Sequence, residues 1–187
     1  KDAVGTPAIH EREENFLRRA IAQWSKSPYL EVLGNHDARR LSIVSFVVRH
    51  RTGEGPSRYV HHNFVAQLLN DLFGIQARSG CSCAGPYGHR LLGIDLTRSK
   101  AIEDAVVRGC ESVKPGWVRV NFNYFISEET FQYIVGAVEL VAEHGWRLNG
   151  DNHHTLRFRD PALAETKNID QEIAVAEHFR PGGYRLE

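Results

Sequence analysis

The sequence predicts an α/β (α+β) domain in which helices pack on a small mixed sheet of about four strands. Two kinds of apolar pattern alternate along the chain and indicate both classes of element. Residues 41–48 form a run rich in β-branched side chains, which is typical of a buried strand. Residues 127–145 carry apolar side chains at helical spacing. Because such elements follow one another along most of the chain, we expect one compact core.

The first three elements are predicted before residue 50. Apolar residues of segment 11–26 recur at helical spacing, and Ser27-Pro28 ends that pattern. Residues 29–33 are predicted to be a short strand, and the glycine- and asparagine-containing segment 34–37 is predicted to be a turn. The strand 41–48 follows this turn.

The middle of the chain is predicted to contain two helices and a strand. Asn63 is a suitable cap for a helix with one apolar stripe to residue 72, and Gly74 is placed to end it. Residues 75–78 are predicted to be a short strand. A loop rich in glycine and cysteine follows, and Ser99 then opens a helix that stops near Gly109.

The last two elements are the most regular. Residues 117–122 alternate between apolar and polar side chains, as a half-buried strand does. Ser127 is placed to cap the final helix, Glu128 and Glu129 lie favourably in its first turn, and Gly145 ends it.

Composition narrows the classes of function. The 187 residues include 23 Lys and Arg balanced by 23 Asp and Glu, which argues against nucleic acid as the main partner. No run of about 18–20 uncharged apolar residues is present, so no membrane partner is expected and the protein is predicted to be soluble and cytoplasmic. Three cysteines, an odd number, do not make a disulfide framework. Any use of these thiols is therefore expected to be chemical.

The ends of the chain suggest that it is a piece of a longer protein. It begins with Lys1 and contains no methionine. Residues 149–187, which include Pro161 and a Pro-Gly-Gly sequence, are expected to form a tail.

The loop 78–90 carries the most reactive side chains. Cys81 and Cys83 follow a predicted strand, and His89 and two arginines would favour the thiolate form. Cysteines are also common as buried apolar filler, which is the alternative without chemistry. A zinc site completed by His89 or His61-His62 is a further alternative, but the cysteine spacing matches no Cys-x-x-Cys knuckle.

Arg119 is the second candidate for chemistry. It is the single charged residue in the apolar strand segment Val118-Arg119-Val120. A charge in such a position is costly unless it is paired, so Arg119 is expected either to meet a buried acid or to bind an anionic ligand.

Three motifs in this chain, in the right order, resemble those of the class V aminotransferase family. The segment Arg78-Ser79-Gly80-Cys81-Ser82-Cys83-Ala84 is similar to the R-x-G-x-x-C-A loop of group II cysteine desulfurases and selenocysteine lyases, and Pro86 follows it. Val4-Gly5-Thr6-Pro7 is similar to the family's G-G-T-P segment. Val118-Arg119-Val120, followed by Tyr124, resembles its arginine strand.

The resemblance implies the C-terminal small domain of a fold-type-I enzyme that uses pyridoxal 5'-phosphate. By this resemblance, Cys83 is the nucleophile that takes sulfur from a substrate cysteine as a persulfide, and Arg119 binds the substrate α-carboxylate. Thr6 would reach the cofactor phosphate across a homodimer interface. Residues 1–10 would belong to the large-domain and interface region, and residues 11–148 to the small domain. The partners implied are the large domain, an amino-acid substrate and a sulfur-acceptor protein.

The chain departs from the family pattern in three places. Cys81 and Ser82 stand where the family has two histidines, and the segment 95–115 is longer than expected, which suggests an added surface helix. The Schiff-base lysine is also missing, because none of the five lysines lies in a Ser-x-His-Lys context. The cofactor lysine is therefore expected N-terminal to residue 1, and the isolated chain is expected to be inactive.

Two alternative functions stay open. In the first, the parent enzyme would be an aminotransferase, epimerase or other lyase that uses Arg119 without a catalytic cysteine. In the second, the chain would be a non-enzymatic module that binds an anion or a metal through its cysteine loop.

Overall fold

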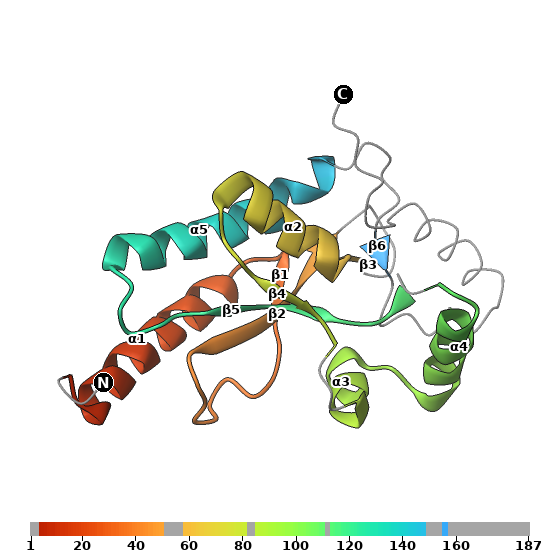
Figure 1. The fold of residues 1–187 in the computed structure, drawn as a ribbon, viewed down its shortest axis with the longest axis horizontal. Helices are drawn as coiled ribbons and strands as arrows, with labels where there is room; N and C mark the ends of the chain where they lie inside the picture. Colours follow the sequence, from red (N-terminus) through yellow and green to blue (C-terminus); the bar gives the residue numbers. More distant parts are fainter. Residues whose placement is uncertain (1–3, 51–57, 82–84, 111–112, 149–154, 157–187) are drawn as a thin grey trace.

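The computed structural model describes residues 4–50, 58–81, 85–110, 113–148 and 155–156 (Figure 1). The helices are α1 (Thr6–Trp24), α2 (His62–Phe73), α3 (Gly85–Leu92), α4 (Leu96–Val107), α5 (Glu128–His144) and the 3-10 turn η2 (Gly145–Leu148). The strands are β1 (Leu30–Val32), β2 (Ile43–His50), β3 (Arg58–Val60), β4 (Arg78–Gly80), β5 (Trp117–Asn121) and β6 (Thr155–Leu156). The predicted α+β class is confirmed.

Strand β2 is the centre of a six-stranded sheet whose described pairings are all antiparallel. Phe46 is paired with Val32 of β1 on one side and with Val118 of β5 on the other. Further along β2, Val48 is paired with Val60, so β3 continues the line of β5. Strand β4 lies outside β5, and β6 lies outside β3.

One face of the sheet carries the main core. Helices α1, α2 and α5 pack on this face (Figure 1). Their apolar side chains surround Phe46 and Phe122, both fully buried. The opposite face has a smaller apolar cluster, to which α3 and the turn after it contribute Leu92 and Ile94. The two faces therefore differ in how completely they are covered.

The helix ends follow the predictions only where the caps were identified correctly. Helix α5 begins after Ser127, which accepts a hydrogen bond from the backbone N–H of Thr130, as predicted. Gly74 ends α2 in the left-handed conformation, at φ 65°, also as predicted. The cap of α2 is His61 and not Asn63.

The other boundaries are also shifted. Helix α1 begins five residues earlier than predicted, because Pro7 fits the first turn of a helix, where its missing N–H has no partner to lose. Asp95 caps α4, so Ser99 lies inside that helix. Part of the predicted loop 78–90 is the helix α3, and β4 begins at Arg78, where the predicted strand ends.

Helix α4 occupies the segment that was expected to be an added surface helix. Only Ala105 of this helix is fully buried, and Leu96 is 88% exposed. The tail 149–187 lies outside the described residues except for β6. None of the helices within the described ranges combines the length and the apolar character that crossing a bilayer requires.

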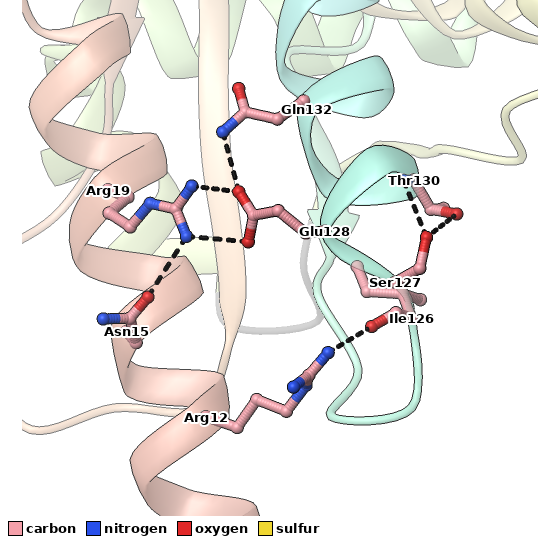
Figure 2. A network of polar contacts seen from close by, with 8 residues as sticks. All are labelled: Arg12, Asn15, Arg19, Ile126, Ser127, Glu128, Thr130 and Gln132. Carbon is pink, nitrogen blue, oxygen red and sulfur yellow. Dashed lines mark hydrogen bonds and ion pairs between the residues drawn. The ribbon is translucent and has the colours of Figure 1, made fainter.

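A polar network joins the middle of α1 to the start of α5 (Figure 2). Arg19 forms a two-point ion pair with Glu128, with Arg19 Nη1 3.0 Å from Glu128 Oε2. Gln132 donates to the same carboxylate at 2.9 Å, and Asn15 accepts from Arg19 at 3.3 Å. The hydrogen bonds from Arg19 and then from Gln132 lower the pKa of Glu128 from 4.5 to about 2.

Replacing Glu128 with glutamine is expected to lower stability at neutral pH, and most of this effect is expected to be lost by about pH 2. The folded-state pKa is below the unfolded one, so the stabilisation is fully present above pH 4.5 and is lost as the pH falls through about 2. Because the pair is exposed, the difference in melting temperature is expected to be a few degrees at most. Thermal unfolding of both proteins from pH 7 to pH 2 measures it, and a difference as large at pH 2 as at pH 7 would contradict the assignment.

Candidate anion site on the open sheet face

Strand β5 divides its side chains between the two faces of the sheet. Val118 and Val120 belong to the main core beneath the helices. Trp117 and Arg119 point to the opposite face, because successive side chains of a strand alternate. Trp117 is buried in the smaller apolar cluster, whereas Arg119 is half-buried. The predicted candidate Arg119 is therefore on the less covered face.

Arg119 lies in a row of side chains that crosses four neighbouring strands. Its direct partners are Ser45 on β2 and Arg78 on β4, and paired residues of antiparallel strands share a face. Leu33, just after β1, donates its backbone N–H to the Ser45 carbonyl at 2.8 Å and so continues the row. Two arginines and a hydroxyl are thus adjacent on one face.

This face is closed at one end and open at the other. Toward α3, Val47 of β2 is only 6% exposed and Gly88 of α3 approaches the Trp117 ring. At the other end, Ile43 lies on the same face of β2, two residues before Ser45, and is 40% exposed. A small molecule could therefore approach Arg119 from the Ile43 end.

Unpartnered donors gather on this face. Within the described part of the chain, five buried side-chain nitrogens have no hydrogen-bond partner: Arg40 Nε, Arg40 Nη2, Trp117 Nε1, Arg119 Nε and His62 Nδ1. The first four lie on or beside the Arg119 face. Buried polar groups are normally paired, and guanidinium and indole nitrogens only donate hydrogen bonds. A ligand bound at this face is therefore expected to be an anion that supplies hydrogen-bond acceptors.

Arg40 reaches this face from the loop between β1 and β2. Its Nη1 lies 3.4 Å from the Leu33 carbonyl oxygen. Arg40 Nη1 and the Tyr87 hydroxyl of α3 both lie within 4 Å of the point where a side chain on Gly34 would begin, so Arg40 and Tyr87 are neighbours. Burial lowers the pKa of Arg40, and Tyr87 opposes that shift.

A third arginine on the same face, Arg49, is paired with a carboxylate. Arg49 Nη2 lies 2.9 Å from Glu31 Oε2, and the Tyr59 hydroxyl donates to the same oxygen at 2.8 Å. This ion pair accounts for Arg49 structurally. Among the described residues, no carboxylate forms an ion pair with Arg40 or Arg119. In this part of the chain, Arg119 therefore does not meet a buried acid, which was one of its two predicted roles.

The other predicted site residues are not brought to Arg119 by the described structure. Cys83 lies outside the described residues, whereas Cys81, which follows β4 directly, is a free and exposed thiol. Thr6 is exposed at the first residue of α1, a helix that packs on the other face of the sheet. In the described ranges, no three His, Cys, Asp or Glu side chains are grouped as a metal site would need.

Sequence reasoning missed Arg40, Tyr87 and Trp117. Trp117 carried a usable signal, because its position two residues before Arg119 in a strand puts both side chains on one face. Arg40 and Tyr87 carried none, since one is in a loop and the other in an unpredicted helix.

The described residues fit a carboxylate better than they fit pyridoxal phosphate itself. The cofactor must be linked to a lysine amine. The described lysines are Lys26, Lys100 and Lys114, and none of them belongs to β2, β4 or β5, the strands that carry the row around Arg119. The unpartnered guanidinium nitrogens, by contrast, have the donor geometry that a carboxylate accepts.

A scan against models of protein families and a search of curated proteins found no match to this chain.

Proposed function

We propose that this chain is the C-terminal small domain of a pyridoxal-phosphate-dependent enzyme of the class V aminotransferase type, in which Arg119 binds the α-carboxylate of an amino-acid substrate. The observation that carries the proposal is the buried Arg119 Nε, which has no partner among the described residues although it is next to Ser45 and Arg78. A guanidinium suits a carboxylate because it donates two parallel hydrogen bonds.

The sulfur chemistry in this proposal is assigned to Cys83, as in a cysteine desulfurase or selenocysteine lyase. The cysteine loop begins where β4 ends, and β4 is the strand that pairs with β5 at Arg119. A thiol carried by this loop would act on an amino acid whose carboxylate Arg119 holds. Cys83 would remove the substrate sulfur and keep it as a persulfide for an acceptor protein.

The remaining parts of the proposal concern the rest of the enzyme. The cofactor would be held by a large domain outside these 187 residues and would stabilise negative charge on the substrate when bound. The enzyme would be a cytoplasmic homodimer. Thr6 is exposed at the start of α1, so its hydroxyl is accessible for contact with a cofactor phosphate of the partner subunit.

The first test compares this chain with the polypeptide that its complete gene encodes. After incubation with pyridoxal phosphate and dialysis, the complete polypeptide is expected to keep the visible absorbance of the bound cofactor, and the 187-residue chain is not. In the complete polypeptide, Arg119→Gln is expected to retain the colour but to raise KM for the amino acid roughly ten- to hundred-fold, because a charged hydrogen bond is lost.

Three outcomes would contradict the proposal. Colour in the 187-residue chain that borohydride fixes would place the cofactor lysine inside it. Absence of colour in both proteins would show that neither binds pyridoxal phosphate and would contradict the proposed cofactor. An unchanged KM in Arg119→Gln would contradict the role of Arg119 in binding the substrate carboxylate. Arg18 is an exposed arginine on the opposite side of the sheet, and Arg18→Gln, the control variant, is expected to behave like the wild type.

The same polypeptide separates the desulfurase from an aminotransferase, epimerase or other lyase. Cys83→Ala is expected to abolish sulfur release from cysteine while the cofactor colour is retained. Unchanged turnover of another amino acid by this variant would favour an enzyme without a catalytic cysteine.

A further inference from the structure

The donors on the open sheet face exceed what one carboxylate needs. An α-carboxylate held by Arg119 leaves Arg40 Nε and Nη2 still buried and without partners among the described residues. A half-buried guanidinium with unpaired nitrogens is costly, and water or an anion must satisfy it. Arg40 therefore requires an explanation of its own.

Arg40 is held in place by its surroundings. Its Nη1 is anchored at the Leu33 carbonyl oxygen, and the Tyr87 hydroxyl of α3 is beside it. Gly34 has φ of 92°, a left-handed conformation that suits glycine, and a side chain there would begin 3.5 Å from Arg40 Nη1. The loop thus leaves space at the place where the guanidinium lies.

The separation of Arg40 from Arg119 suits a short molecule with two acidic groups. Leu33, which anchors Arg40, is hydrogen-bonded to Ser45, and Ser45 is the direct partner of Arg119. Two strand spacings of about 4.8 Å place the anchor of Arg40 roughly 10 Å from the Arg119 backbone. The Arg40 guanidinium at this anchor and the Arg119 backbone are therefore separated by that distance across the sheet.

We infer that Arg40 is a specificity-determining residue that binds a second acidic group, so that the site selects amino acids with an anionic side chain. The inference rests on the proposed function, because Arg119 takes the α-carboxylate in both. Tyr87 contributes a hydroxyl donor next to Arg40, and Trp117 contributes an indole N–H on the same face that has no partner among the described residues. Arg49 plays no part, since Glu31 already pairs with it.

The three tryptophans provide a direct reporter in the 187-residue chain. Trp24 Nε1 donates to the Val135 carbonyl at 3.3 Å, and Trp146 Nε1 donates to the Glu143 carbonyl at 3.0 Å. Trp117 Nε1 alone of the three has no partner among the described residues. Its NMR signal, assigned with Trp117→Phe, is expected to move when an anion enters the site, while the other two indole signals stay in place.

The experiment titrates matched amino acids that differ only in the side-chain acid. L-Aspartate is compared with L-2-aminobutyrate, and L-glutamate with L-norvaline. The wild-type chain is expected to bind at least one acidic member roughly ten- to hundred-fold more tightly than its neutral match. Arg40→Gln is expected to abolish this preference, Arg40→Lys to keep part of it, and Arg119→Gln to weaken the binding of all four ligands.

The outcomes separate this inference from the proposed function. A preference that survives in Arg40→Gln, or a wild-type chain that binds both members of each pair equally, overturns the inference and leaves the role of Arg119 intact. Absence of binding of all four ligands to the wild-type chain also overturns it, and the cofactor absorbance then decides the proposed function by itself. Unchanged Trp24 and Trp146 signals show that each variant is folded.

Discussion

Replacing Trp24 with alanine is expected to lower the free energy of unfolding by about 3–5 kcal/mol, the range for removing a large aromatic side chain from a core. Trp24 ends α1 and is fully buried. Its ring centroid lies 5.3 Å from that of Phe46 on β2 and 5.9 Å from that of Phe122 after β5. The indole N–H also donates to the Val135 carbonyl of α5. One side chain therefore connects two helices to the sheet, and alanine would leave a cavity between them.

Urea unfolding followed by far-UV circular dichroism measures this loss. Trp24→Phe is expected to cost much less, because a ring still fills most of the space and only the hydrogen bond and part of the volume are removed. Leu96→Ala is the matched surface control, since Leu96 is 88% exposed, and its effect should stay within about 0.5 kcal/mol. Equal losses for Trp24→Ala and Leu96→Ala would show that Trp24 is not at the centre of the core.

The parts of the fold that the sequence predicted well are those with local signals. Helix α5 has a serine cap, two acids in its first turn and a continuous apolar stripe, so its start and end were both predicted. Strand β5 alternates clearly, and this alternation also places Trp117 and Arg119 on one face. In these elements, the residues that specify the structure are neighbours in the chain.

The elements that were missed depend on distant residues. Strands β3 and β6 have three and two residues, which is too short for a periodic pattern, and they exist as partners of β2 and of one another. The cap of α2 is the ring nitrogen of His61, and histidine is not among the usual capping residues. Similar reasoning applies to α3, whose glycine-rich start resembled a loop.

The candidate site divides in the same way. Arg119 was found because a charge inside an apolar strand is conspicuous in the sequence. Arg40 was not, because its guanidinium is buried through the meeting of the β1–β2 loop with α3, where Tyr87 lies. Such tertiary contacts carry no periodicity. The unpaired nitrogens that point to an anion become visible only when all neighbours of a side chain are known.

Gly116 is expected to tolerate no side chain, although it lies in ordinary backbone conformation directly before β5. A Cβ at this position would lie 2.6 Å from the backbone carbon of Gly80 and 2.6 Å from the ring of the buried His62. The Gly80 carbon belongs to the backbone of β4. His62 is 6% exposed, and its ring is hydrogen-bonded to the Lys114 carbonyl, so neither neighbour can move freely. Gly116→Ala is expected to cost about 1–3 kcal/mol through overpacking.

The same substitution at a second glycine, Gly136, is expected to change stability in the opposite direction. A Cβ at Gly136 of α5 would meet nothing within 4 Å, so Gly136→Ala is expected to stabilise the protein by about 0.5–1 kcal/mol through helix propensity. Urea unfolding of both variants measures the contrast, and equal effects would contradict it. Because β4 and β5 are pushed apart at Gly80 in Gly116→Ala, the Arg78–Arg119 pairing two residues away should also be disturbed. The Trp117 indole signal is therefore expected to shift in Gly116→Ala and to stay unchanged in Gly136→Ala, which links the close approach of these strands to the shape of the anion site.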